Sequence, residues 1–248
     1  RSLSRADING DCMYRRYFKR VFDILSSATA LFLAFPLLLC LAWLVRIKLG
    51  SPVIFSQVRP GKDGHLFRLY KFRSMTDARD SNENLLSDAE RMTDFGRKLR
   101  ATSLDELPEL INILKGDMSV VGPRPQLVRD MVFFTPEEMK RQSVLPGLTG
   151  LAQISGRNNI DWKERFRYDL QYIQHITFAE DMRIIYRTIF KVGAQEDVAT
   201  EGMETSEDYG DWLLRRNKIA PDDYAGNQIR AKHLLERFKR NGERQGTV

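Results

Sequence analysis

An uncharged run at residues 24–45 restricts the fold of this chain more than any other feature. At about 1.5 Å per helical residue, a run of this length matches the thickness of a bilayer's hydrocarbon core. The run is apolar on all faces, as lipid contact requires. It is too long for a secretory signal peptide, lacks a clean small-residue cleavage site and continues into Arg46 and Lys48. We therefore expect a membrane helix, with a buried helix of a soluble protein as the alternative.

The charges around this run bear on its topology. Basic residues normally stay on the cytoplasmic side of a membrane, and here they flank both ends of the run. They are Arg15, Arg16, Lys19 and Arg20 before it, and Arg46 and Lys48 after it. Pro36 lies in the middle, where its ring removes a helical hydrogen bond and favours a kink. The residues therefore favour a helix that enters and leaves on one face, although a kinked span remains open.

Composition excludes several classes of site. The formal net charge of +6 favours anionic partners such as lipid head groups, nucleotides or nucleic acid. Cys12 and Cys40 are too few for a disulfide framework or a thiolate metal site. The three histidines are isolated, which argues against zinc and against a serine triad, and no glycine-rich phosphate loop motif occurs.

The remainder of the chain predicts a mainly helical α+β fold. Residues 53–73 read as a β-hairpin, because two arms rich in β-branched and aromatic residues flank a Pro/Gly/Asp turn. Residues 76–91 predict a solvated helix or loop, residues 100–114 a short amphipathic helix, and residues 116–125 a rigid loop. Helices are expected from residue 136 and over residues 161–192, with a loop or short strand at 146–156.

Three segments follow from this reading. Residues 1–48 hold the N-terminal segment and the membrane helix, and residues 49–192 form the main domain. Residues 193–248 are polar and charged, with an amphipathic basic stretch at 227–240, and are expected to form an appendage.

Two adjacent carboxylates, Asp105 and Glu106, are the strongest candidates for chemistry. They also admit a purely structural explanation, because Ser103 and Glu106 have the spacing of a capping box and acidic residues complement the start of a helix. The catalytic interpretation uses the electrostatic field at the start of the helix, which would keep Asp105 ionised and nucleophilic. Two neighbouring carboxylates can also share a divalent cation.

Basic residues supply candidate phosphate ligands. Arg124 lies between Pro123 and Pro125, which restrict the backbone on both sides, and a guanidinium binds phosphate in a bidentate manner. An arginine on a surface turn is the alternative. The further candidates, each equally compatible with ordinary surface charge, are Arg100, Lys71, Arg73 and Arg157.

Together these segments resemble the monotopic phosphoglycosyltransferases, also called bacterial sugar transferases or polyprenyl-phosphate hexose-1-phosphate transferases. The matching strings occur in family order between residues 19 and 192. They are KRVFD (19–23), GSPVIF (50–55), QVRPG (57–61), YKFRSM (70–75), TSLDELP (102–108), GDMSVVGPRP (116–125) and PGLTG (146–150).

The resemblance implies a re-entrant helix–break–helix in one leaflet of the bacterial inner membrane, and a small catalytic domain (49–192) on the cytoplasmic face with amphipathic membrane-surface helices. It implies Mg²⁺ at Asp105 and Glu106, with a UDP-sugar and a polyprenyl phosphate as substrates. Asp105 would be the nucleophile and Glu106 its helper. Arg124 and Arg100 would neutralise phosphate charge, whereas Lys71 and Arg157 match basic positions near the family's site.

Some features depart from the family or remain open. The family usually has Ser before the membrane-breaking proline, whereas this chain has Phe35, which leaves the geometry of the break open. The segment after residue 193 exceeds short family members and could form a homodimer contact, a membrane contact or a lid. The rival functions are a non-catalytic membrane-surface adaptor and a nucleic-acid binder. The second is disfavoured because the basic residues lack an aromatic stacking pattern.

Overall fold

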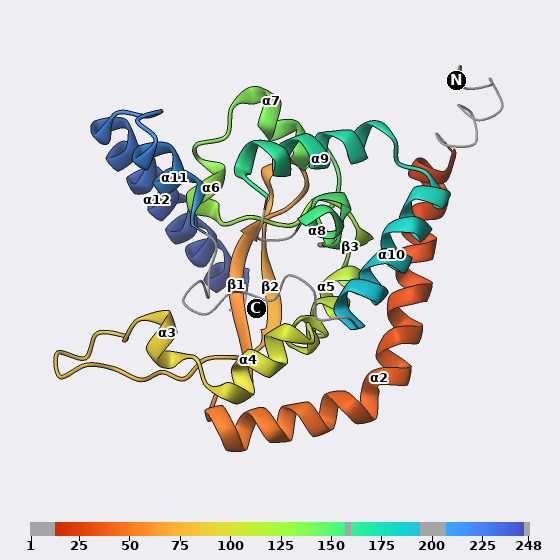
Figure 1. Cartoon of the computed structure of the whole chain (residues 1–248), viewed down its shortest axis with the longest axis horizontal. Coiled ribbons are helices and arrows are strands. Elements are labelled where there is room, and N and C mark those ends of the chain that lie inside the picture. Colours follow the sequence, from red (N-terminus) through yellow and green to blue (C-terminus); the bar gives the residue numbers. More distant parts are fainter. Residues whose placement is uncertain (1–12, 157–159, 194–206, 246–248) are drawn as a thin grey trace.

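A long bent helix wraps around a small domain built on a β-hairpin (Figure 1). The computed structural model describes residues 13–156, 160–193 and 207–245. Within these ranges the architecture is mainly helical with two small sheets, in agreement with the predicted α+β class.

The long helix α2 (Lys19–Leu49) follows a π-helical segment, η1 (Tyr14–Phe18). Together they form the one helix in the described residues that is long and apolar enough to cross a membrane. Figure 1 shows α2 as two arms that meet at a bend near its middle. Pro36 is the internal proline, and its missing N–H and bulky ring explain a bend there. The predicted kink at Pro36 is therefore confirmed, whereas the break that the family resemblance implies is not seen, because the helix continues without interruption.

The first arm of α2 is attached to the domain mainly by polar side chains. Asp23 is 1% exposed and accepts hydrogen bonds from Ser119 Oγ and Val120 N, both at 3.0 Å. Lys19 forms an ion pair with the buried Asp181 at 2.6 Å. Arg20 donates to the carbonyl of Ile113 at 2.6 Å, near the C-terminal end of α5 (Glu109–Lys115).

The second arm is attached by apolar packing. Leu41, Val45 and Leu49 are buried against Phe72 of the hairpin and Leu99 of α4 (Asp94–Ala101). The opposite surface of α2 carries large apolar side chains that the domain does not cover. Their exposed fractions reach 79% at Phe32, 72% at Leu33 and 64% at Trp43. Both arms therefore pack on the same domain and leave an apolar outer face.

The predicted hairpin is confirmed. Strands β1 (Ile54–Pro60) and β2 (Leu66–Phe72) pair antiparallel from Ile54↔Phe72 to Pro60↔Leu66, through the short turn η2 (Lys62–Gly64). In that turn Asp63 and Gly64 adopt positive φ, which a Gly and a residue such as Asp tolerate well.

The segment after the hairpin agrees with the predicted helix or loop, whereas the helix predicted after it is divided. Residues 76–87 are largely extended, with an antiparallel bridge between Arg79 and Leu85, and only α3 (Asp88–Arg91) is helical. The helix expected over residues 100–114 is divided into the end of α4, the 3-10 turn η3 (Leu104–Glu106) and α5. Ser103 and Pro108 lie at the two divisions, the first with φ of 54°.

The second half of the domain surrounds a two-stranded parallel sheet. Strands β3 (Ser119–Val121) and β4 (Gly147–Thr149) form this sheet. The loop 122–127 follows β3 in the chain. The helices and turns are α6 (Val128–Met131), α7 (Pro136–Met139), η4 (Lys140–Ser143), α8 (Leu151–Gly156), α9 (Trp162–Gln174) and α10 (Phe178–Gly193). The helices predicted from residue 136 and within residues 161–192 are confirmed.

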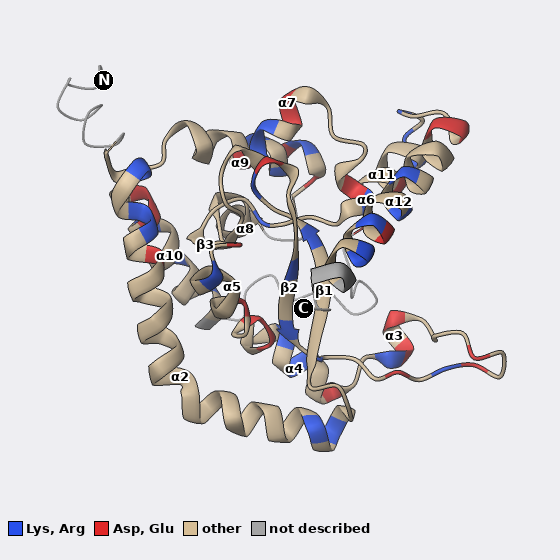
Figure 2. Ribbon diagram, turned by 180° about the vertical axis from the view of Figure 1, so that it is seen from behind, with Lys and Arg blue, Asp and Glu red and all other residues tan. Residues whose placement is uncertain are grey.

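The C-terminal helices α11 (Tyr209–Arg215) and α12 (Pro221–Gln245) lie across the hairpin from α2 in Figures 1 and 2. A cluster of buried aromatic residues joins them to α6 and α9. It consists of Phe133, Trp162, Phe166, Tyr209 and Trp212. Tyr209 N also donates to Asp130 Oδ1 at 2.8 Å. These helices are therefore packed onto the domain.

Candidate active site

A cleft of about 1200 Å³ lies in the domain and is lined by most of the predicted site residues. Those that line it are Lys71, Arg73, Arg100, Asp105, Glu106 and Arg124. Arg157 lies outside the described residues. Figure 2 shows basic residues on the hairpin strands and acidic residues near α5.

The two carboxylates sit on a tight turn and do not begin a regular helix. Ser103 adopts the left-handed conformation, and its side chain makes no capping hydrogen bond. The turn closes through the backbone, where Glu106 N donates to Ser103 O at 3.2 Å. The predicted capping box is therefore wrong, because a left-handed Ser103 does not have the extended backbone that an N-cap residue needs.

Glu106 is the acceptor that joins the two principal cations. Its Oε1 accepts from Lys71 Nζ at 2.7 Å and from Arg124 Nη2 at 2.6 Å. Burial opposes ionisation of Glu106, but the charges of Arg124 and Lys71 outweigh it and hold its pKa far below the usual range. Lys71 comes from β2 and Arg124 from the loop after β3, so the fold brings together residues 35 and 18 positions from Glu106.

Asp105 has the opposite electrostatics. Its side chain is buried (7% exposed), and no described residue donates a hydrogen bond to its carboxyl group. Burial and the adjacent charge of Glu106 raise its pKa to about 6, against the opposing pull of Lys71, Arg100 and Arg124. The expectation that a helix start lowers this pKa is thus wrong. Asp105 nevertheless remains mostly ionised at neutral pH.

The loop that carries Arg124 is held from behind by buried arginines. Arg141 Nη2 donates to the Arg124 carbonyl at 2.8 Å, and the same guanidinium binds Asp169 Oδ2 at 2.9 and 2.6 Å. Arg59 Nη1 donates to the Pro125 carbonyl at 3.3 Å. Backbone placement is also enforced at Gly147, where a Cβ would overlap the backbone nitrogen of Gly122.

The remaining predicted cations line the cleft but bond elsewhere. Arg100 Nε donates to Ser74 Oγ at 2.9 Å. Arg73 forms an ion pair with Asp77 at 3.0 Å and donates to the carbonyl of Leu49, the last residue of α2. The structure therefore gathers Lys71, Glu106 and Arg124 into direct contact and leaves these two arginines at the edge of the group.

Sequence reasoning missed two buried groups. Glu109 is 2% exposed and lies 3.0 Å from Lys71 Nζ. Burial and the charge of Glu106 raise its pKa to about 7, although Lys71 opposes this. In the sequence Glu109 resembles an ordinary acidic residue of a first helical turn. Arg141 and Asp169 were missed because 28 positions separate them and no local pattern links them.

The carboxylates of the cleft suit a divalent cation that is weakly held better than one that is enclosed by protein ligands. In the part of the chain that the structure describes, no group of three His, Cys, Asp or Glu side chains is positioned to hold a metal ion. Oε1 of Glu106 is occupied by two cations, whereas Asp105 has open oxygens facing the cleft. Magnesium commonly binds through one or two carboxylates together with water and substrate phosphates, and these residues fit that mode.

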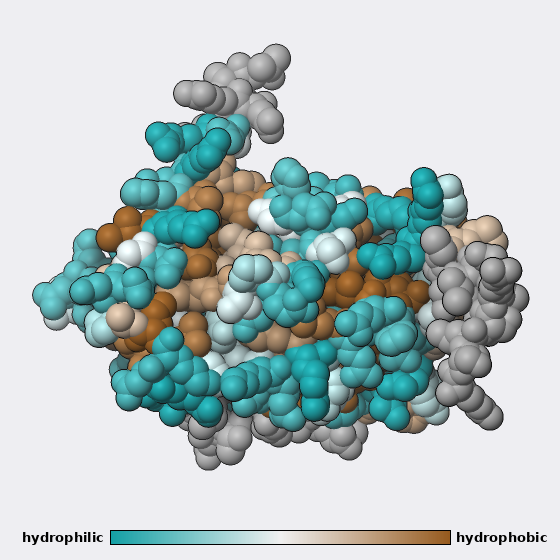
Figure 3. Space-filling view, turned by 90° about the horizontal axis from the view of Figure 1, so that it is seen from above, coloured by the Kyte–Doolittle hydropathy of each residue, from teal (hydrophilic) through white to brown (hydrophobic). Residues whose placement is uncertain are grey.

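The lining of the cleft combines apolar and basic side chains. From α10 it includes Ile185, Ile189 and Val192, together with Thr188 and Lys191. Its arginines include Arg59, Arg124, Arg129 and Arg165. Figure 3 shows apolar patches framed by polar residues on one face of the molecule. The carboxylates lie in a cleft that can receive both an apolar chain and phosphate groups.

Comparison with known proteins places the sequence in a protein family. The family model described as "Bacterial sugar transferase" matches residues 14–195, which include α2 and every residue placed around Glu106. The C-terminal helices α11 and α12 lie outside this match.

Individual relatives agree with the family match. The chain is 46% identical over 189 residues to the uncharacterized sugar transferase EpsL of Bacillus subtilis, covering 76% of this chain and 94% of the relative. It is 44% identical to a UDP-glucose:undecaprenyl-phosphate glucose-1-phosphate transferase of Klebsiella pneumoniae, and 39% identical to an undecaprenyl-phosphate galactose phosphotransferase of Salmonella typhimurium. These two matches cover 70% of this chain but only 40% of each relative.

Proposed function

Since the chain belongs to the bacterial sugar transferase family, we propose that it transfers a sugar-1-phosphate from a UDP-sugar to polyprenyl phosphate and releases UMP. Relatives named for this transfer act on undecaprenyl phosphate, with glucose or galactose as the sugar. The product would serve the first membrane step of bacterial glycoconjugate assembly. The observation that carries the proposal is Asp105, a buried carboxylate that lines a cleft rich in basic residues and accepts no hydrogen bond from any residue that the structure describes.

The first step is attack by Asp105. A carboxylate oxygen forms a bond to the β-phosphorus of the UDP-sugar, and the bond from that phosphorus to the bridging oxygen breaks. UMP leaves with the electron pair, and the protein retains a sugar-phosphoryl-aspartate. A carboxylate that accepts no protein hydrogen bond is more nucleophilic than a fully hydrogen-bonded one, which suits Asp105 to this role.

The second step regenerates the protein. A phosphate oxygen of the polyprenyl phosphate attacks the phosphorus of the intermediate, the bond to Asp105 breaks, and the carboxylate takes back its electron pair. The lipid leaves as a diphosphate-linked sugar. Division into two steps allows one site to use a soluble donor and a lipid acceptor in turn. The basic and apolar side chains that line the cleft suit these two substrates.

Other residues would stabilise charge during the transfer. Glu106 holds Lys71 and Arg124 at fixed positions beside Asp105, so their charges face the reacting phosphate without further reorganisation. Arg100 lies close enough to Asp105 to lower its pKa and would add to this field. Magnesium, held by Asp105 and by one free oxygen of Glu106, would neutralise phosphate charge when bound.

We further propose that α2 is re-entrant and that the domain lies on the cytoplasmic face of the bacterial inner membrane. Three observations support this. Both arms of α2 pack on the same domain, both ends are basic, and the apolar outer face is uncovered. Single cysteines at Lys19 and Lys48, in a protein with the natural cysteines replaced, should both be labelled from the cytoplasmic side. Labelling from opposite sides would exclude the re-entrant topology.

The activity is tested by UMP release from the full chain in lipid nanodiscs with Mg²⁺, undecaprenyl phosphate and a panel of UDP-sugars. We expect release with at least one donor and none with Asp105→Asn. Asp94→Asn is the matched control, because Asp94 is an 88% exposed partner of Arg97 on α4 and does not itself line the cleft. Mass spectrometry with donor alone should show a sugar-phosphate adduct on Asp105. Persistent UMP release by Asp105→Asn would remove this residue as nucleophile, and absence of release by the wild type would favour the adaptor function.

A further inference from the structure

The cleft contains more arginines than the group around Glu106 uses. Arg124 is paired with Glu106, Arg141 with Asp169, and Arg129 with Asp208. Arg59 and Arg165 also line this cleft, but no carboxylate in residues 13–156, 160–193 and 207–245 forms an ion pair with either of them. The charges of these two guanidinium groups are therefore not balanced by an ion pair with a described carboxylate.

Arg165 is held in position by an aromatic ring. It lies in the first turn of α9, and its Cζ is 4.5 Å from the centre of the Trp162 ring. Trp162 is itself buried, and its indole N–H donates to the carbonyl of Glu207 at 3.1 Å. Stacking on a ring leaves the donors at the edge of a guanidinium available for an oxyanion. Arg165 is thus pre-positioned without a protein counterion.

Arg59 lines the same cleft from β1, and both arginines lie close enough to Arg124 and Asp130 for these charges to affect their pKa values. Its Nη2 donates to Gln57 Oε1 at 2.7 Å and its Nη1 to the Pro125 carbonyl, but its buried Nε has no hydrogen-bond partner. Burial and the nearby Arg124 lower the pKa of Arg59 to about 10. Burial also lowers the pKa of Arg165, together with Arg141 and Arg124. The surroundings thus disfavour both positive charges in the absence of an added anion.

The nearby carboxylates do not supply that anion. Asp169 and Asp208 are engaged by Arg141 and Arg129. Asp130 accepts from Tyr209 N, and burial together with Asp208 raises its pKa to about 6. Asp130 therefore carries its charge less readily than an ordinary aspartate does.

We propose that Arg59 and Arg165 form an anion subsite that binds the phosphate of the nucleotide part of the donor. The proposal rests on the proposed transfer, in which the α-phosphate of the leaving UMP gains negative charge as its bond to the β-phosphorus breaks. Donors placed where charge develops stabilise such a step. The subsite adds two guanidiniums to the group that faces the β-phosphate.

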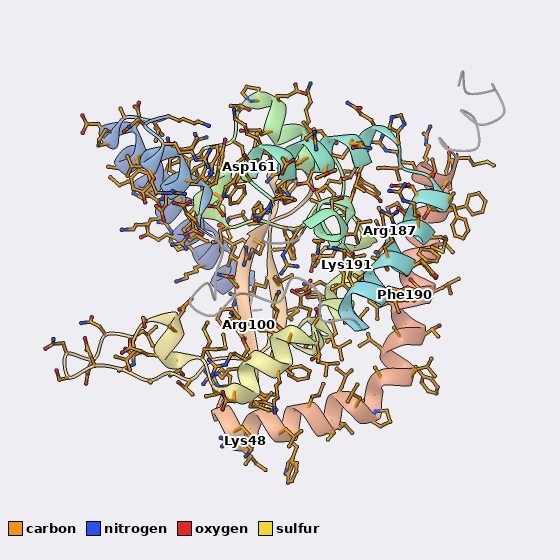
Figure 4. All side chains as sticks on the ribbon, in the orientation of Figure 1. Lys48, Arg100, Asp161, Arg187, Phe190 and Lys191 are labelled. Carbon is orange, nitrogen blue, oxygen red and sulfur yellow. The ribbon has the colours of Figure 1, made fainter. Side chains whose placement is uncertain are left out.

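The position of the subsite favours the nucleotide over the lipid phosphate. In Figure 4 Asp161, which immediately precedes α9, and Lys48, near the end of α2, lie on opposite sides of the domain, with Arg100 between them. Arg165 is in the first turn of α9, on the side away from the second arm of α2. A soluble nucleotide reaches that side without leaving water, whereas a lipid phosphate stays near the membrane helix.

The C-terminal segment takes part in this subsite indirectly. Glu207 holds the Trp162 indole, and Tyr209 packs on the same ring with centroids 5.0 Å apart. Residues beyond the family match at 195 therefore position Arg165 through Trp162. The segment acts as a support for the nucleotide end of the cleft.

The test compares Arg165→Gln with Arg167→Gln in the full chain. Arg167 lies on the same helix, with a 64% exposed side chain, a long ion pair to Glu164 and a contact with the Tyr168 ring. Isothermal titration measures the affinity for UMP, for uridine and for a short-chain polyprenyl phosphate. We expect Arg165→Gln to weaken UMP binding by about tenfold or more, the usual loss for a charge-assisted hydrogen bond, with uridine and polyprenyl phosphate unchanged. Arg165→Lys should recover part of the affinity, and Arg167→Gln should match the wild type.

Each other result decides against a part of the proposal. Unchanged UMP affinity in Arg165→Gln would overturn the subsite. A loss confined to polyprenyl phosphate would assign these arginines to the acceptor, and an equal loss for uridine would show that they do not recognise phosphate. If the wild type binds UMP in an Arg165-dependent manner but releases no UMP from any donor, the subsite stands and the proposed transfer fails.

Discussion

Two buried aspartates of this chain, Asp181 and Asp105, differ in the hydrogen bonds that their carboxyl groups accept. Asp181 is fully buried and accepts hydrogen bonds from Tyr14 and Tyr172 at 2.7 Å and from Lys19 at 2.6 Å. Asp105 is also buried, yet no described residue donates to it, and it faces a cleft. Its neighbour Glu106 takes the two cations instead.

The difference shows how burial of a carboxylate serves structure in one place and chemistry in another. Around Asp181 the donors compensate the loss of water, so the charge ties the first arm of α2 to α10. Around Asp105 the loss of water is not compensated by hydrogen bonds, which leaves an oxygen lone pair available to a substrate. A buried aspartate therefore stabilises the fold at Asp181 and is available for reaction at Asp105.

The largest expected effect separates the two aspartates by activity. Asp105→Asn should lower UMP release by more than about a thousandfold, because an amide cannot form the phosphoryl intermediate. The same change should raise the melting temperature. The raised pKa of Asp105 means that its charge destabilises the fold, an effect that grows between about pH 4 and 6 and is complete above pH 6. Activity assays and thermal unfolding at pH 7 check both, and a loss of activity that accompanies unfolding would contradict the assignment.

Asp181→Asn should show the reverse pattern. Loss of this carboxylate leaves Lys19 buried without its partner, with an expected cost of about 3 kcal/mol, or roughly a hundredfold in the folding equilibrium. Turnover per folded molecule should change little. Chemical unfolding in detergent measures the cost, and Asp94→Asn, at an 88% exposed side chain, provides a control that should stay within about 0.5 kcal/mol. Equal stability of the two variants would argue against a structural role for Asp181.

Glu106→Gln tests the group that surrounds the nucleophile. The neutral amide would hold Lys71 and Arg124 less firmly, so kcat/KM for UMP release should fall by about tenfold to a hundredfold. Part of the loss should appear in KM for the UDP-sugar, because the two cations would no longer be fixed for the phosphates. Steady-state kinetics decide this, and wild-type values in the variant would show that Glu106 does not organise the site.

The smallest expected effect is on pH dependence. Asp105 protonates as the pH falls through about 6, so kcat/KM should decrease by about tenfold per pH unit below that value. Asp130 also has a pKa raised to about 6, but it lies outside the group around Glu106. Asp130→Asn should therefore show the same decrease of kcat/KM at low pH. If Asp130→Asn abolished this decrease of kcat/KM at low pH, the decrease would belong to Asp130 and not to Asp105.

Much of the architecture was predictable because its signals are local. The apolar run, the flanking charges and Pro36 indicate a bent membrane helix, and the Pro/Gly turn at residues 60–64 indicates the hairpin. The pairing of Asp105 and Glu106 with an arginine between two prolines likewise identified the candidate site. The division of residues 100–114 into three elements was not predictable, because it depends on the left-handed backbone at Ser103.

The sequence by itself determined the long apolar helix, the family resemblance and the residue types of the site. Only the tertiary structure decided their electrostatics. The raised pKa of Asp105 and the buried Glu109 depend on which charges lie within a few ångströms, and those come from β2, η3 and the loop after β3. The same holds for Arg165, which Trp162 and the C-terminal segment hold against the cleft. Periodicity and turn residues act between neighbours along the chain, whereas burial and charge act through space.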